Sequence, residues 1–233
     1  MSERIIRYLS IVHSHQAAVS PPILSKECPT GAMAAQNDTC DKILQAASER
    51  IRHFGYAKTT MAEIAADLRM SAGNLYRFFA SKLDIAEALA KERRENEFKI
   101  YADIVQRSDI SPREKLKMAL MSDAQRIRAA VSEQPRIVEI SDIIARERPG
   151  FWADSLAEER VFLREILKEG IEKGVFAPVQ DIDKTADAIQ SAVYKFRTPS
   201  FSSRMTEEEL TRDLGAVLDI LLAGLAPIQG STP

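Results

Sequence analysis

Glycine and proline are scarce in this sequence, and long apolar runs are missing. The 233 residues include nine glycines and ten prolines, and segments of alternating β-branched residues, which are typical of strands, are absent. No apolar run approaches the roughly 18 residues of a membrane span, so we expect no membrane association. Because 45% of the residues are hydrophobic, the chain can bury a sizeable core, and the sequence predicts an all-α protein.

Cysteine and histidine are also rare, with two and three residues. Cys28 and Cys40 lack the spacing of a metal site, and we expect both to be reduced thiols of a cytoplasmic protein. The N-terminus lacks the apolar segment of a signal peptide. The sequence shows neither a nucleophile beside a base nor a glycine-rich phosphate loop. We therefore expect no enzyme, no cofactor and no metal site.

Charge of one sign does not dominate the chain, but it is unevenly distributed. The net charge of −2 argues against unspecific coating of nucleic acid by the whole surface. Residues 39–82 carry seven Lys or Arg against four Asp or Glu, whereas the chain after residue 82 is acidic. We expect a small, mildly basic head to be joined to an acidic body.

Helix signals divide the chain into three parts. Residues 1–36 contain three prolines and a glycine within a short span and lack helical periodicity, which predicts a poorly ordered arm. A head over 37–97 begins with a helix capped by Asp38 or Thr39. Helical patterns continue over 98–226, which predicts a C-terminal helical domain.

Residues 59–82, TTMAEIAADLRMSAGNLYRFFASK, begin three helices in quick succession. Thr60 and Glu63 have the spacing of a capping box, and Ser71 is a second cap. A short helix, a tight turn and another short helix over 60–79 are typical of a helix-turn-helix. This motif places the second helix in the major groove of DNA.

Side chains of the second short helix suit contact with DNA. Ala72 and Gly73 are small enough to allow close approach to base edges, and Asn74 can donate and accept hydrogen bonds toward adenine. Tyr76 and Arg77 can reach phosphates or bases. The same pattern also occurs in ordinary packing motifs, in which Tyr76 would be a core residue with its hydroxyl at the surface.

This segment resembles the TetR family of bacterial transcriptional regulators over about residues 37–97. Four elements agree in order and spacing: Gly55-Tyr56, Thr59-Thr60, Ile64-Ala65 and GNLYRFFASK. The resemblance implies a DNA interface of eight residues: Thr60, Ser71, Ala72, Gly73, Asn74, Tyr76, Arg77 and Lys82.

The sequence departs from the family pattern at two positions. Many members have a histidine where this chain has Phe78, and many have Lys or Arg near Ala72. Fewer phosphate contacts are therefore expected, unless Arg77 compensates. Each missing contact lowers the salt dependence of binding by about 0.9 in the slope of log K against log salt.

The C-terminal domain offers candidates for a ligand pocket and a dimer contact. Family members generally sense a small molecule there, and large, adaptable side chains are available to line a cavity, although such residues also form ordinary core. They are Phe98, Tyr101, Met118, Met121, Trp152, Phe162 and Ile166. The two last helices carry apolar stripes that would form a four-helix bundle across a two-fold axis, or would close the core of the protomer. The stripes include Ile189, Val193, Phe196, Leu214, Val217 and Leu221.

These observations favour a homodimeric repressor that binds double-stranded DNA at a palindromic operator. A small-molecule effector would release it by tilting a long helix expected over 82–108. One alternative is an activator or global regulator without a ligand. Another is a helical interaction protein that does not bind DNA.

Overall fold

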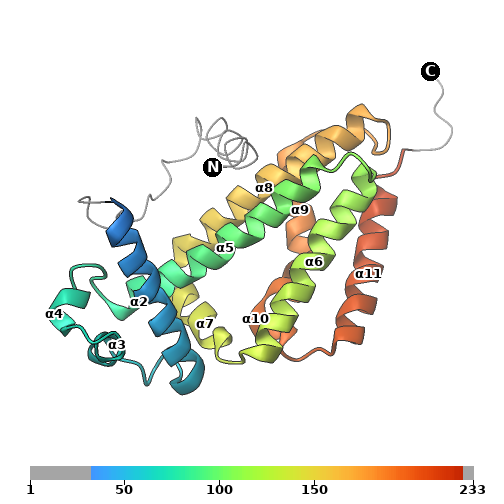
Figure 1. Ribbon diagram of the computed structural model, residues 1–233. Coiled ribbons are helices and arrows are strands. Elements are labelled where there is room, and N and C mark those ends of the chain that lie inside the picture. The colour runs from blue at the N-terminus through green and yellow to red at the C-terminus, as the bar shows by residue number, and fades with distance from the viewer. Residues whose placement is uncertain (1–32, 228–233) are drawn as a thin grey trace. The chain divides into compact units, whose positions relative to one another are not determined.

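The computed structural model describes residues 33–227 (Figure 1). Within this range every regular element is a helix, which confirms the predicted all-α class. The elements are α2 (Met33–Phe54), α3 (Met61–Asp67), α4 (Ala72–Leu75), α5 (Lys82–Gln106), α6 (Pro112–Glu133), α7 (Ile137–Glu147), α8 (Pro149–Glu172), α9 (Ile182–Val193), the 3-10 helix η2 (Tyr194–Arg197), α10 (Pro199–Ser202) and α11 (Glu207–Gly224). None of the helices between residues 33 and 227 combines the length and apolarity that a membrane span requires.

The described residues form two compact units. The head unit comprises 33–95 and 136–151, and the body unit comprises 96–135 and 152–227. The first boundary lies within α5, close to the expected end of the head at residue 97. The segment 136–151, which contains α7, lies in the head unit, whereas the sequence pattern placed it in the C-terminal domain.

The first described helix differs from the expectation at its start and at its cysteine. α2 begins at Met33 instead of near Asp38, so the last residues of the predicted arm are helical, and the remainder of that arm lies outside the described residues. Cys40 is disulfide-bonded, which contradicts the prediction of a reduced thiol. The other cysteine, Cys28, lies outside the described residues.

The head unit has a small core of its own, to which α2, α3, α4 and the start of α5 contribute. Its buried members are Ile43, Ala47, Met61, Ile64, Ala65, Leu75 and Ile85. Met70 packs against the same cluster as Leu75, as expected for a hydrophobic staple across the Ser71 cap. The short helices are therefore held by packing, because an isolated helix of their length would not be stable in water.

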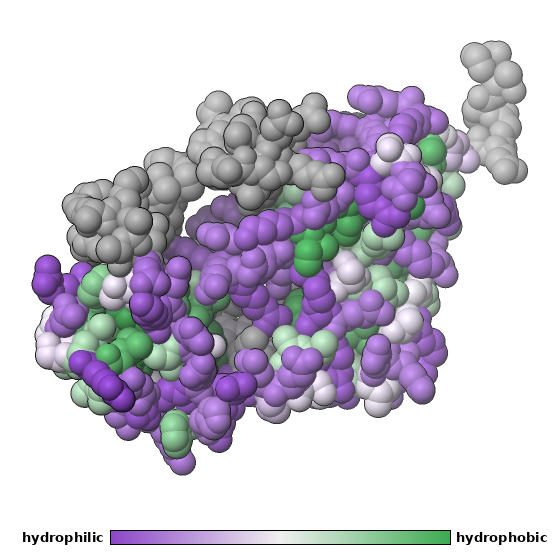
Figure 2. All heavy atoms as spheres, in the orientation of Figure 1, coloured by the Kyte–Doolittle hydropathy of each residue, from purple (hydrophilic) through white to green (hydrophobic). Residues whose placement is uncertain are grey.

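The body unit surrounds a larger core, in which α11 packs against α6 and α9 (Figure 1). Capping boxes begin two of its helices, at Ser111 and at Thr206. On the face seen in Figure 2, hydrophilic residues cover most of the surface and apolar residues appear in small patches between them.

Candidate nucleic-acid interface

The helix-turn-helix begins with the predicted capping box. The backbone N–H of Thr60 donates to Glu63 Oε2 at 2.9 Å, and the N–H of Glu63 donates to Thr60 Oγ1 at 3.3 Å. The hydroxyl of Thr60 also donates to that carboxylate, at 2.8 Å. Hydrogen bonds from the side chain and then the backbone of Thr60 lower the pKa of Glu63. The box fixes the first turn of α3.

The turn between α3 and α4 depends on an arginine in a left-handed conformation. Arg69 has φ +54°, a region that side chains other than Gly and Asn rarely adopt. The N–H of Arg69 donates to Ala66 O at 3.0 Å, and that of Met70 donates to Ala65 O at 3.0 Å. These bonds close the C-terminus of α3. No sequence signal marks Arg69, because a glycine is the usual residue at such a position.

The recognition segment, residues 71–77, is short and anchored by one side chain. Ser71 caps α4 and accepts a hydrogen bond from the N–H of Asn74 at 3.2 Å. Leu75 is fully buried in the head core. Tyr76 is 53% exposed, and Arg77 is exposed, so Tyr76 is not a core residue.

The eight predicted DNA contacts all lie in the head unit, and none is buried. Five are exposed: Thr60, Ser71, Gly73, Tyr76 and Arg77. Ala72, Asn74 and Lys82 are half-buried. All eight thus keep surface for a partner, and their contact with DNA stays a prediction.

Lys82 has protein partners that its predicted role did not include. Its ammonium donates to the carbonyl oxygens of Tyr56 and Thr59, at 2.7 Å each. The same nitrogen lies 4.2 Å from the centre of the Tyr56 ring. Desolvation lowers the pKa of Lys82, while the charge of Glu63 acts in the opposite sense.

α7 closes the head from a distant part of the sequence. Glu139 Oε2 accepts a hydrogen bond from the N–H of Tyr56 at 2.9 Å. Arg136 donates to the carbonyls of Arg52 and His53 at the C-terminus of α2. These carbonyls have no partner within the helix, and a cation there also complements the helix dipole.

Gly55, which follows the last residue of α2, leaves the space that the side chain of Glu139 occupies. Gly55 has φ +87°, and a Cβ atom at this position would lie 2.9 Å from Glu139 Oε2. Directly after the last residue of α7, Arg148 forms ion pairs with Asp84 and Glu87 of α5, at 3.0 Å each. Sequence patterns identified Gly55 as the helix end but not the partners of α7, because these contacts span more than 60 residues.

Six of the seven predicted pocket residues come together in the body unit. The rings of Phe98 and Tyr101 lie 5.8 and 5.7 Å from that of Phe162. These three rings and Ile166 are buried in the body core. Met118 and Met121 pack against it, whereas Trp152 is half-buried and is not part of this cluster.

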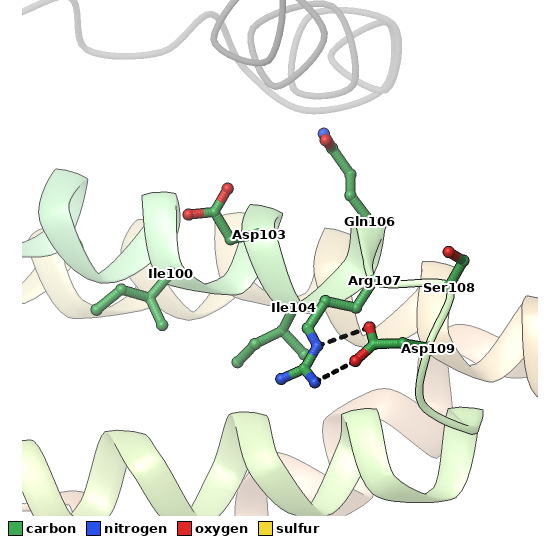
Figure 3. Close-up of a pocket in the computed structure, with 7 residues that line it drawn as sticks. All are labelled: Ile100, Asp103, Ile104, Gln106, Arg107, Ser108 and Asp109. Atoms are coloured by element: carbon green, nitrogen blue, oxygen red, sulfur yellow. Dashed lines mark hydrogen bonds and ion pairs between the residues drawn. The ribbon is translucent and has the colours of Figure 1, made fainter.

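A hollow of about 500 Å³ on the body unit has a different lining (Figure 3). It is open to solvent and lies along the end of α5 and the following loop. Within it the guanidinium of Arg107 donates to both carboxylate oxygens of Asp109, at 3.0 and 2.5 Å. Its lining does not include the predicted pocket residues and combines two isoleucines with five polar residues: Ile100, Asp103, Ile104, Gln106, Arg107, Ser108 and Asp109.

A buried ionic cluster in the body unit was not predicted. Arg197 of η2 pairs with Glu159 of α8 and with Asp123 of α6, and both carboxylate side chains are fully buried. Burial alone would lower the pKa of Arg197, but the charges of Asp123 and Glu159 raise it well above its ordinary value. A sequence pattern reveals charge but not burial, so it gives no signal for this cluster.

Most residues of the predicted dimer stripe lie in the core of the protomer. Four of the six residues are at most 2% exposed and belong to the body core: Ile189, Val193, Phe196 and Leu214. Val217 and Leu221 are partly buried against that core. These residues contribute to the core of the protomer, and a dimer contact through the same helices stays a prediction.

Comparison with known protein families gives a match in each of the two units. Residues 43–89 match the family model described as bacterial regulatory proteins of the tetR family. Residues 112–218 match a second model, described as a tetracyclin repressor-like C-terminal domain.

Individual proteins show the same likeness. The HTH-type transcriptional repressor KstR2 of Mycobacterium tuberculosis is 27% identical over 151 residues, which cover 63% of this chain and 74% of that protein. A transcriptional regulator from Cytophaga hutchinsonii matches with a TM-score of 0.64 and 21% identity, over 81% of this chain and 99% of that one. A complex of SmeT with triclosan also has a TM-score of 0.64, with 18% identity over 84% and 95% of the two chains. SmeT is the repressor of a multidrug efflux pump of Stenotrophomonas maltophilia.

The two family models together cover most of the chain, and the first spans the helix-turn-helix built by α3, α4 and the Arg69 turn. The chain therefore belongs to the TetR family of bacterial transcriptional regulators, with a DNA-binding helix-turn-helix head, and it is not an enzyme.

Proposed function

We propose that this protein is a homodimeric repressor that binds a palindromic operator and releases it when a small molecule binds the body. The observation that carries the proposal is the recognition segment, in which Ser71, Tyr76 and Arg77 are exposed while Leu75 anchors the segment in the head core. The similarity to KstR2 and SmeT, both repressors by name, supports repression.

The side chains of this segment have distinct roles in the proposal. Asn74 reads a base edge, since its amide can donate and accept at once, whereas Tyr76 and Arg77 contact phosphates or bases next to it. Thr60 and Ser71 lie at the two helix starts. Because its target is chromosomal DNA, the protein would act in the cytoplasm.

Two heads are needed for useful affinity, and a palindromic site matches a two-fold dimer. We place the dimer contact on the outward faces of α9 and α11. Tyr194, which begins η2 directly after α9, is 55% exposed, and Ile220 of α11 is 73% exposed. Ala188, Ala192 and Ala216 are exposed small residues that permit close packing.

The effector would bind among the aromatic and methionine side chains of the body, around Phe98, Tyr101 and Phe162. SmeT binds triclosan, an aromatic molecule, in a chain of the same fold. Release requires that the effector prefer the state that does not bind DNA. A shift of that equilibrium from 1:99 to 99:1 takes about 10⁴-fold differential affinity, or about 5.5 kcal/mol.

The test is a selection from random double-stranded oligonucleotides with the purified full chain at moderate salt. We expect an inverted repeat whose half-site centres lie about 34–36 Å apart, one helical turn, bound by a dimer. Arg77→Ala should weaken binding to it, whereas Arg204→Ala, which removes an exposed arginine of the body unit between α10 and α11, should leave binding unchanged. A monomeric protein that selects no palindrome would refute the proposal.

The same variants separate the alternatives. If the chain were an interaction protein that does not bind DNA, Arg77→Ala and Tyr76→Phe would leave capture of its protein partner unchanged. A ligand-independent activator would select an operator but would show no release by any small molecule. The position of the operator relative to the promoter distinguishes activation from repression.

A further inference from the structure

Lys82 makes contacts that a phosphate-binding lysine does not need. Its ammonium has three N–H donors, and two of them are directed at the carbonyls of Tyr56 and Thr59, at 2.7 Å each. The face of the Tyr56 ring covers the same nitrogen at 4.2 Å. Lys82 is therefore engaged with the loop that joins α2 to α3, residues 55–60.

This loop is held from several sides. Thr59 is fully buried, and its hydroxyl donates to the carbonyl of Gly55 at 2.9 Å. The carbonyl of Tyr56 accepts from the N–H of Thr59 at 3.2 Å as well as from Lys82. Buried carbonyl groups need donors, and a charged donor makes the stronger hydrogen bond. Lys82 supplies that donor to two carbonyls at once.

The position of the loop is transmitted to the recognition segment. Thr60, which caps α3, directly follows Thr59. Ile64 of α3 and Leu75 of α4 are both fully buried in the head core. Because α3 and α4 share this packing, a displacement of the loop moves the two helices together with respect to α2.

We propose that Lys82 serves DNA binding as a positioning residue, which holds the loop between α2 and α3 and thereby the recognition segment, and that its ammonium does not bind a phosphate. This inference rests on the proposed binding of DNA by the head. The two carbonyls and the face of the Tyr56 ring together engage the three N–H donors, so an ammonium that bound a phosphate would have to give up at least one of these contacts.

The salt dependence of DNA binding tests the assignment. A phosphate contact contributes about 0.9 to the slope of log K against log salt, whereas a positioning contact within the protein contributes nothing. We expect Lys82→Met to weaken binding of the selected operator about tenfold, or about 1.4 kcal/mol, at an unchanged slope. Lys82→Arg should recover most of the affinity, because a guanidinium can donate to both carbonyls and stack on the Tyr56 ring.

Two further variants make the test specific. Tyr56→Leu removes the ring beneath the ammonium without removing a charge, and we expect it to weaken binding about threefold at an unchanged slope. Lys58→Met removes the same charge as Lys82→Met from an exposed position of the same loop and should leave the affinity within about twofold.

A slope that is shallower by about 0.9 in Lys82→Met, together with wild-type affinity in Tyr56→Leu, would overturn the inference and leave the proposed function intact. If Lys82→Met loses helical structure by circular dichroism, Tyr56→Leu and Lys82→Arg decide the question. A wild-type protein that selects no DNA at all would refute the proposed function and this inference with it.

Discussion

Replacement of Gly170 by alanine probes how closely the body core is packed. Gly170 lies near the end of α8, and its carbonyl accepts hydrogen bonds from the N–H groups of Val175 and Phe176, at 2.8 and 3.0 Å. These bonds fold the chain back, so that the ring of Phe176 lies directly over the glycine. A Cβ atom at position 170 would lie 2.0 Å from Phe176 Cδ2, far inside van der Waals contact.

The expected loss of stability follows from that overlap. Phe176 is 1% exposed, so its ring cannot move aside into solvent. Overpacking of a core by a methyl group costs typically about 1–3 kcal/mol, and we expect the upper end of this range for Gly170→Ala. For a chain of this size, about 3 kcal/mol corresponds to a lower melting temperature by about 6–12 °C.

Gly215 provides the matched control, because it is a helical glycine of α11 and a Cβ atom added to it would meet no other side chain within 4 Å. Gly215→Ala should raise stability slightly, by up to about 1 kcal/mol, since alanine favours the helix. Thermal unfolding followed by circular dichroism in the far ultraviolet measures both variants. Equal melting temperatures for Gly170→Ala and the wild type would show that the fold-back over Gly170 is not formed as described.

Four other predictions concern charge and backbone conformation. Gly55→Ala places a methyl group against Glu139 at positive φ and should lower the melting temperature, by about 1–2 kcal/mol of stability. Arg197→Met removes the guanidinium that pairs with two buried carboxylates, of which Asp123 keeps Arg126 as a partner, and should lose about 3–5 kcal/mol in urea unfolding. Arg69→Gly relieves the left-handed arginine and should raise the melting temperature by about 1–2 °C, whereas a fall would contradict the strain. The free energy of unfolding should fall as the pH is lowered below about 4.5. Folding lowers the pKa of several carboxyl groups, so their ionised form stabilises the folded protein above the unfolded pKa, and this contribution is lost when they are protonated. These carboxylates are Glu63, Glu114 and Glu209, and their replacement by Gln should flatten the acid limb.

The parts of the fold that were predicted correctly depend on neighbours in sequence. A capping box needs only a hydroxyl and a carboxylate three residues apart, so those at Thr60, Ser111 and Thr206 could be identified and are confirmed. The Gly55 helix end and the two short helices followed from equally local signals. The apolar stripes of α9 and α11 were also identified, but a stripe shows only that one face is buried and not what buries it.

The parts that were missed depend on distant partners. Lys82 was recognised as a charge at a helix start, while its acceptors lie 26 and 23 residues away. Arg197 and Asp123 are 74 residues apart, and nothing local distinguishes them from solvated charges. Arg69 was missed for another reason: its conformation is imposed by the packing of α3 on α4 against its own preference.

The contribution of α7 to the head has a practical consequence for chimeric regulators. Arg136 and Glu139 complete the end of α2, although some 80 residues separate them from it. If only the continuous N-terminal part of the head were transferred to another regulator, Arg136 and Glu139 would not be transferred with it. The side chains of the recipient protein would take their place at the end of α2. Swaps between related regulators should therefore exchange two stretches of chain, or restore an arginine and a glutamate at the corresponding positions of the host.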